Sequence, residues 1–162
     1  SSGAVTADAA GHLLVGELGD ATRARIGLRA DSIDDPYLRL PADALEFQPR
    51  PGRVVVAEVP LQPTGEVQVR LYLRDAGGGE RGLSAVPVEL WRDGAAAATG
   101  RTEFDGTVVL DGLRPGRYEL RLDAALAARL QLRLMEAVSV TIPARGGYAG
   151  EAIARVAIGG SM

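Results

Sequence analysis

The chain of 162 residues contains no cysteine, no lysine and a single histidine. Without cysteine it can form neither a disulfide nor a thiolate–metal site, and it has no thiol nucleophile. All 18 basic residues are arginine, which we attribute to a GC-rich coding sequence because no local spacing calls for so many planar guanidinium groups. The one histidine, His12, precedes an apolar segment, where we expect a turn or surface position rather than a catalytic one.

Aromatic residues are also scarce, at 4%, so the core has to be built from Val, Leu, Ile and Ala. The net charge is −3 and no basic block is interleaved with aromatic residues, which argues against nucleic acid as a partner. No apolar run is long enough to span a bilayer as a helix. The N-terminal residues have neither the charged start nor the apolar stretch of a signal peptide. We expect the chain to be a piece of a larger protein.

What the sequence does have is alternation of apolar and polar residues, most clearly over 86–122. Val86, Val88 and Leu90 point to one side, and an Asp-Gly turn follows at 93–94. Further turn signals at 104–106 and 114–116 separate two more alternating runs, at 107–110 and 118–122. This pattern is typical of a small antiparallel β-sandwich.

The same pattern extends in both directions. In the second half we expect strands at 66–74, 138–142 and 153–158, with a hairpin loop of sequence DAGGGERG at 75–82. In the first half we expect short strands at 13–15, 23–29, 45–47 and 53–61, the last of which is the most β-branched. Residues 62–65, with a proline and a glycine, form the best linker.

The pattern predicts only one short helix. The alanine-rich stretch 124–129 favours a short helix, and a strand begins at about 130. No helix is long enough to cross over a parallel sheet, which disfavours an α/β fold. We therefore predict an all-β protein of two small antiparallel β-sandwich domains in tandem, with a Greek-key, transthyretin-like arrangement, over 1–65 and 66–162.

The sequence offers no local sign of catalysis, and we predict neither an enzyme nor a cofactor. No serine lies in a nucleophile elbow, and the glycines of 75–82 neither precede a helix nor carry the Lys-Ser/Thr pair of a phosphate loop. Asp31, Asp34 and Asp35 are the densest carboxylates, but they lack the spacing of a calcium loop, so we expect a solvated turn and no metal.

Three segments of the second half resemble the carboxypeptidase regulatory-like, transthyretin-like module. They are LSAVPVEL at 83–90, TEFDG at 102–106 and LRPGRYEL at 113–120. The resemblance covers about 66–158 and its Pro-Gly-x-Tyr part is the most specific. It implies a seven-stranded sandwich that is usually not catalytic.

The first half resembles the C-terminal region of fimbrial outer-membrane ushers. The residues that carry this resemblance are VTADAAG at 5–11, LPAD at 40–43 and PRPGRVVV at 49–56. The usual Leu-Pro-Phe-Gly motif and the cysteine pair of the last usher domain are absent, which leaves an atypical or archaic-type usher.

The usher resemblance implies a binding module at the periplasmic face of the outer membrane, attached to a membrane barrel. Its partners would be periplasmic chaperone–subunit complexes during pilus assembly. Because aromatic and Arg residues are enriched at interfaces, the candidate contact residues are Trp91, Arg92 and Tyr72. Trp91 is out of phase with the buried residues of its strand, so it either anchors a partner or covers a hydrophobic edge.

Two other functions remain open. The chain could serve as a structural spacer, a rigid stalk of a secreted or cell-surface protein. A carbohydrate- or peptide-active fragment is the enzymatic option, and it requires a converging polar site that the sequence does not indicate.

Overall fold

The computed structural model describes residues 4–16, 18 and 23–159, and the ends of the two predicted domains, 1–3 and 160–162, lie outside them. The chain divides into two compact units. The first consists of 1–33 and 40–60, and the second of 34–39 and 61–162. The division into a first β-sandwich-like domain over 1–65 and a second over 66–162 stays a prediction.

The first unit is built around one antiparallel strand pair. β1 (Ala24–Gly27) pairs with β3 (Ala44–Phe47), and a single 3₁₀ turn (Ala30–Ser32) follows β1. β1 falls within the strand expected at 23–29, and β3 covers the one expected at 45–47. None of the described residues of this unit is buried. A two-stranded pair without a buried face is marginal in water.

Two expected strands of the first unit are not found. Residues 13–15 and 53–61 have no strand structure, although both lie among the described residues. Val54, Val55 and Val56 expose 80%, 52% and 85% of their surface. The preference of valine for strands comes from packing on a neighbouring strand, so β-branched composition alone does not make one.

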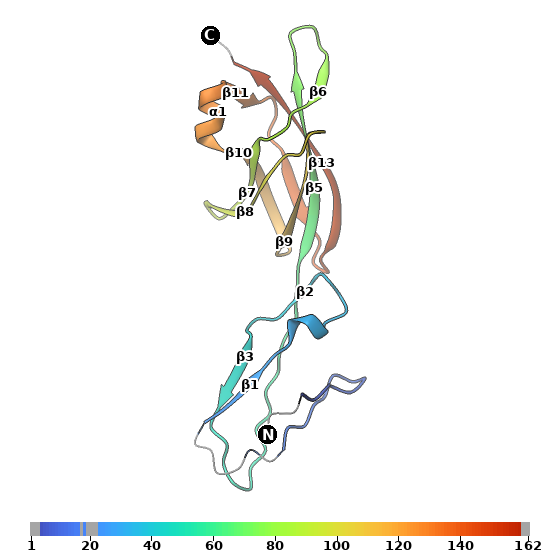
Figure 1. Ribbon diagram of the computed structural model, residues 1–162, viewed down its shortest axis with the longest axis vertical. Helices are drawn as coiled ribbons and strands as arrows, with labels where there is room; N and C mark the ends of the chain where they lie inside the picture. Colours follow the sequence, from blue (N-terminus) through green and yellow to red (C-terminus); the bar gives the residue numbers. More distant parts are fainter. Residues whose placement is uncertain (1–3, 17, 19–22, 160–162) are drawn as a thin grey trace. The chain divides into compact units, whose positions relative to one another are not determined.

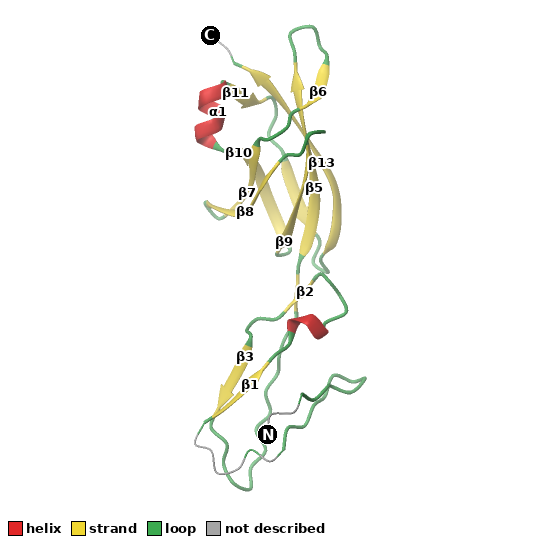
Figure 2. Cartoon of the chain, viewed as in Figure 1, coloured by secondary structure: helices red, strands yellow, loops and turns green. Residues whose placement is uncertain are grey.

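The second unit is an all-β sandwich, as predicted (Figures 1 and 2). One sheet has the order β12-β10-β7-β8; the other runs β11-β13-β5-β6, with β9 also paired to β5. Their bounds are β5 (Gly65–Arg74), β6 (Glu80–Gly82), β7 (Pro87–Arg92), β8 (Ala95–Arg101), β9 (Thr107–Leu113), β10 (Gly116–Leu122), β11 (Leu132–Leu134), β12 (Ser139–Ile142) and β13 (Gly147–Ile158).

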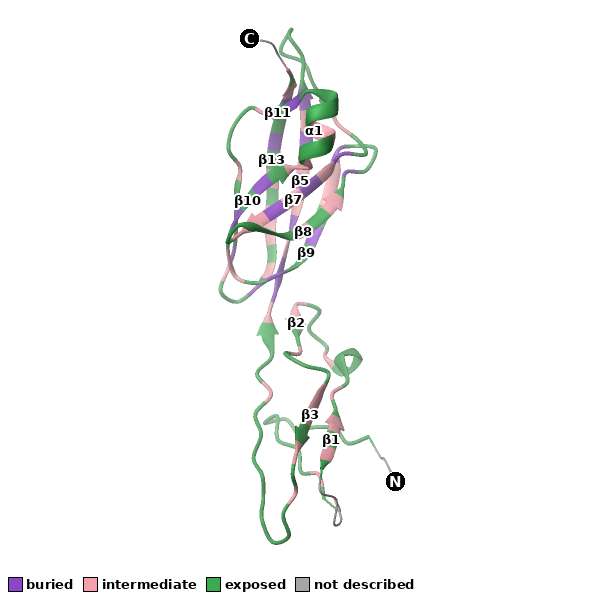
Figure 3. Ribbon diagram, turned by 90° about the vertical axis from the view of Figure 1, so that its left-hand side faces the viewer, coloured by how far each residue is buried: buried purple, intermediate pink, exposed green. Residues whose placement is uncertain are grey.

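β5 is the central strand of its sheet. It pairs antiparallel with β6 and β9 and parallel with β13, the last strand of the unit. Its side chains alternate between buried and half-buried from Gly65 to Leu73, as the purple bands of Figure 3 show. This alternation matches the period of an extended chain with one face on a core.

The core lies between the inner faces of the two sheets. β5 contributes Val67, Val69 and Leu71, which are at most 1% exposed. The opposite sheet contributes Val88, Leu90, Leu120 and Ile142, also at most 1% exposed. Within the described part of the chain, Tyr118 is the one aromatic residue among the buried hydrophobic side chains, in agreement with a core of aliphatic residues.

The short helix is present where the sequence predicts it. α1 (Ala124–Leu130) begins after Asp123, whose carboxylate accepts hydrogen bonds from the amides of Ala125 and Leu126. This is the usual role of Asp at a helix N-cap. Gln131 ends the helix in the left-handed conformation, and β11 follows.

A second small strand pair connects 34–39 to the sandwich. β2 (Leu38–Arg39) pairs with β4 (Gln62–Pro63), so part of the segment expected to be a linker is hydrogen-bonded. The amide and hydroxyl of Thr64 both donate to the carbonyl of Tyr37, at 2.7 and 2.8 Å. Thr64 is buried, so these bonds satisfy a polar group shielded from water.

Thr102 closes the connection between the two sheets. Its hydroxyl donates to the carbonyl of Leu83 at 2.6 Å and accepts from the amide of Val86 at 3.0 Å, while Thr102 itself is 3% exposed. We therefore expect Thr102→Val to lower the free energy of unfolding by about 1–3 kcal/mol, because it removes the hydroxyl partner of the buried Val86 amide and of the partly buried Leu83 carbonyl.

Thr102→Ser is the matched control, because it keeps the hydroxyl, and it should be less destabilising than the valine variant. Urea unfolding of both variants measures the difference. Equal stability of the two variants would show that the hydroxyl bridge contributes nothing.

Candidate functional site

The three predicted contact residues lie at three separate places on the second unit. Tyr72 is on the outer face of β5, and Trp91 is on the outer face of β7 in the opposite sheet. Arg92 follows Trp91 directly but packs over the ring of Tyr118, 5.6 Å from its centroid. The structure therefore does not bring the three side chains into one site.

Tyr72 lies between two groups of charged side chains. The Arg70 guanidinium donates to the Tyr72 hydroxyl at 3.3 Å and pairs with Glu151 at 3.5 Å. Beyond Tyr72, Glu80 accepts from Arg155 at 2.7 Å and from Arg74 at 2.9 Å. The hydrogen bond from Arg155 is the main cause that lowers the pKa of Glu80 below its ordinary value.

The strands beside Tyr72 add apolar side chains to the same surface. In the register of the sheet, Gln68 lies opposite Val109 of β9 and Arg70 lies opposite Ile153 of β13. Val109 and Ile153 are 54% and 43% exposed. We call this surface the Tyr72 face; its residues are Gln68, Arg70, Tyr72, Val109, Glu151, Ile153 and Arg155.

Trp91 is partly covered by its own sheet. The Arg121 guanidinium lies 4.4 Å from the centroid of the indole ring and also pairs with Glu119 at 3.4 Å. The indole Nε1 is buried and has no hydrogen-bond partner within the described part of the chain. This arrangement is that of a tryptophan covering the sheet, stabilised by a cation–π contact.

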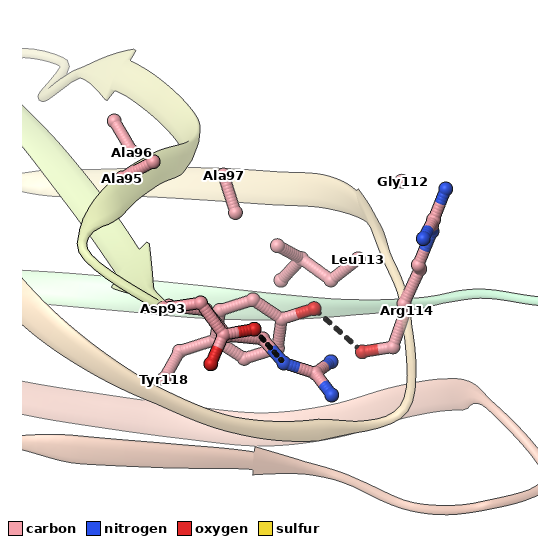
Figure 4. A pocket seen from close by; sticks show the side chains of 9 residues that line it. Asp93, Ala95, Ala96, Ala97, Gly112, Leu113, Arg114 and Tyr118 are labelled. Carbon is pink, nitrogen blue, oxygen red and sulfur yellow. Dashed lines mark hydrogen bonds and ion pairs between the residues drawn. The ribbon is translucent and has the colours of Figure 1, made fainter.

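Arg92 lines a hollow of about 340 Å³ between the start of β8 and the end of β9 (Figure 4). Its floor includes Leu113 and Tyr118, which are 1% and 3% exposed. The Tyr118 hydroxyl donates to the carbonyl of Arg114 at 2.7 Å. The remaining lining residues are Arg92, Asp93, Ala95, Ala96, Ala97, Gly112 and Arg114.

The Pro-Gly-x-Tyr segment shapes this hollow. The Arg92 guanidinium donates to the carbonyl of Pro115 at 2.9 Å and lies against Gly116. A Cβ atom on Gly116 would come within 2.6 Å of Arg92 Nη1, and the φ angle of +141° at this position also favours glycine. The residues that carry the family resemblance at 113–118 therefore have a structural role here.

The turn at 103–106 is equally constrained. The Asp105 carboxylate accepts from the amide and hydroxyl of Thr107 at 3.1 and 2.6 Å, and the hydroxyl bond is the main cause that lowers its pKa. Gly106 has φ +83°, and a Cβ there would lie 2.5 Å from the carbonyl oxygen of Leu71. The turn holds Phe104 with 88% of its surface exposed.

The sequence pattern predicts only a turn at 104–106 and gives Phe104 no functional role. An aromatic residue between two acidic residues at the tip of a turn was the available signal. The hollow had no comparable signal, because Ala97, Leu113 and Tyr118 come from three different strands.

The aspartates and the histidine that the sequence offered as metal or catalytic candidates lie in exposed turns. Asp31 pairs with Arg29 at 3.0 Å, and Asp35 accepts from the amide of Tyr37 at 2.9 Å. The amide of His12 donates to Asp8 at 2.8 Å. Among residues 4–16, 18 and 23–159, no group of three or more His, Cys, Asp or Glu is placed to hold a metal ion. Over the same residues, no helix has the length and apolar character needed to cross a membrane.

Comparison with known proteins adds little at the level of sequence. No protein-family model matches the chain, and no curated protein matches it. Among solved structures, it is similar to GBS52, the minor pilin of Streptococcus agalactiae, with 16% identity and a TM-score of 0.42 over 74% of this chain. The chain spans 61% of the length of that pilin. A similarity this distant carries no argument about function.

Gly116 provides a test of the hollow. We expect Gly116→Ala to lower the free energy of unfolding by about 1–3 kcal/mol, because it strains the backbone and displaces Arg92 from Pro115 and Tyr118. Gly94→Ala is the matched control, since Gly94 also has a positive φ of +78° but no atom within 4 Å of its added Cβ.

The excess cost of Gly116→Ala over Gly94→Ala should shrink in an Arg92→Ala background, and thermal unfolding of the four variants measures it. An excess that persists without Arg92 would show that the guanidinium is not held against this glycine.

Proposed function

We propose that this chain is a non-enzymatic protein-binding module from the C-terminal periplasmic region of an outer-membrane usher. In this function it engages chaperone–subunit complexes during pilus assembly. The support comes from the usher resemblance at 40–43 and 49–56 and the transthyretin-like segments of the second unit. The Tyr72 face is the observation that carries the proposal.

The Tyr72 face is suited to a protein partner that is bound and then released, as a subunit would be during pilus assembly. Tyr72 and Arg70 are held in place by their hydrogen bond, so little side-chain entropy is lost when a partner binds. The exposed side chains of Val109 and Ile153 add apolar area beside them. The arginines of the face already pair with carboxylates, which favours modest affinity over a permanent complex.

The first unit supports attachment to a larger β-structure. Val54, Val55 and Val56 are exposed on a segment that has no strand partner among the described residues. Three neighbouring valines of this kind need a surface that covers them. A strand of an outer-membrane barrel would supply it, in line with the proposed location at the periplasmic face of that membrane.

A structural spacer in a secreted or cell-surface protein is the second candidate. One observation favours it: Thr102, Gly106, Gly116 and Tyr118, which carry the transthyretin-like resemblance, all serve the packing of the sandwich. A spacer would need no Tyr72 face, so binding experiments distinguish the two candidates.

Tyr72→Ala should weaken binding of purified periplasmic chaperone–subunit complexes by about tenfold, the effect expected for removing an interface aromatic residue. Thr141→Ala, an exposed change on the opposite sheet, is the control and should leave binding unchanged. Biolayer interferometry with the immobilised chain measures both. Trp91→Ala tests the other sheet in the same assay. Absence of binding by the unmodified chain would leave the spacer as the better description.

A further inference from the structure

The exposed ring of Phe104 and the hollow at Arg92 lie at opposite ends of the same two strands. The turn that carries Phe104 joins the end of β8 to the start of β9. The hollow is lined by the start of β8, at Ala95–97, and by the end of β9, at Leu113. Each strand has seven residues and spans about 20 Å, so one molecule cannot place its own Phe104 in its own hollow.

Phe104 is presented on a rigid support. The amide of Gly106 donates to the carbonyl of Glu103 at 2.9 Å, and the amide of Glu103 donates to the carbonyl of Thr107 at 2.8 Å. Asp105 adds the two bonds from Thr107. A ring that is 88% exposed on a fixed turn can be buried in a partner with little loss of conformational entropy.

The hollow is chemically complementary to this turn. Its volume of about 340 Å³ leaves room for an aromatic ring. Because Leu113 and Tyr118 are already buried, the apolar surface that such a ring would contact is that of the exposed side chains at 95–97. Two arginines, Arg92 and Arg114, and one carboxylate, Asp93, line it, and Asp93 pairs with Arg92 at 3.7 Å. The hollow therefore keeps a net positive charge, whereas Phe104 stands between Glu103 and Asp105. A docked ring would meet the Arg92 guanidinium, and the two carboxylates beside the ring would be attracted by that net positive charge.

We propose that Phe104 of one copy of this chain docks in the hollow of a second copy. The contact joins two different surfaces, so each pair keeps one free turn and one free hollow, and the association continues head to tail. This self-association stands apart from the partner binding proposed above, because it needs only this chain.

Sedimentation velocity of the full chain over a concentration series tests the contact. The unmodified chain should form dimers and larger species as concentration rises, and Phe104→Ala should weaken the association about tenfold or more. Leu130→Ala, another exposed apolar residue outside both the hollow and the Tyr72 face, is the matched control and should leave it unchanged. Raising the salt from about 0.05 to about 0.5 M should weaken the association, because oppositely charged groups at the surface contribute to the contact.

Ala97→Glu tests the other side of the contact, because the new side chain fills the hollow and repels Glu103 and Asp105. Thr99→Glu adds the same charge to an exposed position of the same strand outside the hollow and is its control. Arg114→Glu is a second blocking variant with the opposite charge in an exposed position.

Mixing the variants gives the sharpest readout. Phe104→Ala keeps an intact hollow and Ala97→Glu keeps an intact Phe104, so each should be monomeric alone. Their mixture should form one-to-one dimers and nothing larger. A thermal midpoint unchanged from that of the unmodified chain verifies that each variant is folded.

Three results would overturn the proposal. The first is an unmodified chain that stays monomeric throughout the series. The second is a Phe104→Ala variant that associates as strongly as Leu130→Ala. The third is a mixture of folded blocked variants that gives no dimer.

Discussion

Burial of one face of β5 is the constraint on which the rest of the second unit depends. Val67, Val69, Leu71 and Leu73 are 0–7% exposed, and β5 pairs with three other strands. Each such side chain contributes about 1.5–3 kcal/mol when fully buried. A shift of register by one residue would place Gln68, Arg70 and Tyr72 in the core, so the pairing has only one acceptable alignment.

The same strand fixes the turns that close the sandwich. The amide of Leu71 donates to the carbonyl of Gly106 at 2.8 Å, and its carbonyl accepts from the amide of Leu83 at 2.9 Å. The turn at 103–106 and the chain at 82–83 therefore meet at the centre of β5, where both Gly82 and Gly106 lack room for a Cβ atom. Phe104 and Tyr72 owe their positions to this junction, which links the packing of the core to the surfaces proposed for binding.

Much of the second unit could be predicted from sequence because its signals are local. Alternation identified β5, β7 and β10, the Asp-Gly pair identified the β7–β8 turn, and the alanine run identified α1. The parallel pairing of β5 with β13 joins strands about 80 residues apart, and no local pattern reports it. The prediction of a strand at 53–61 is wrong for the opposite reason. Its β-branched composition favours a strand, but no neighbouring strand pairs with it among the described residues.

The candidate surfaces were predictable only in part. The phase of Trp91 correctly placed it on the outer side of its strand, yet the contact with Arg121 depends on the register of β7 with β10. The hollow at Arg92 is lined by residues of four strands, β7 to β10, so no single segment of the sequence indicates it. Tyr72, Trp91 and Arg92 were selected by residue type alone, and the folded chain places them on separate surfaces.

Amide hydrogen exchange followed residue by residue tests the central claim most directly. The most protected amides should be those of β5 and of its partners β9 and β13, since strands of a buried core open only with the whole unit. Amides of 53–61 should exchange orders of magnitude faster. Equal protection of 53–61 and β5, or rapid exchange along β5, would contradict the account.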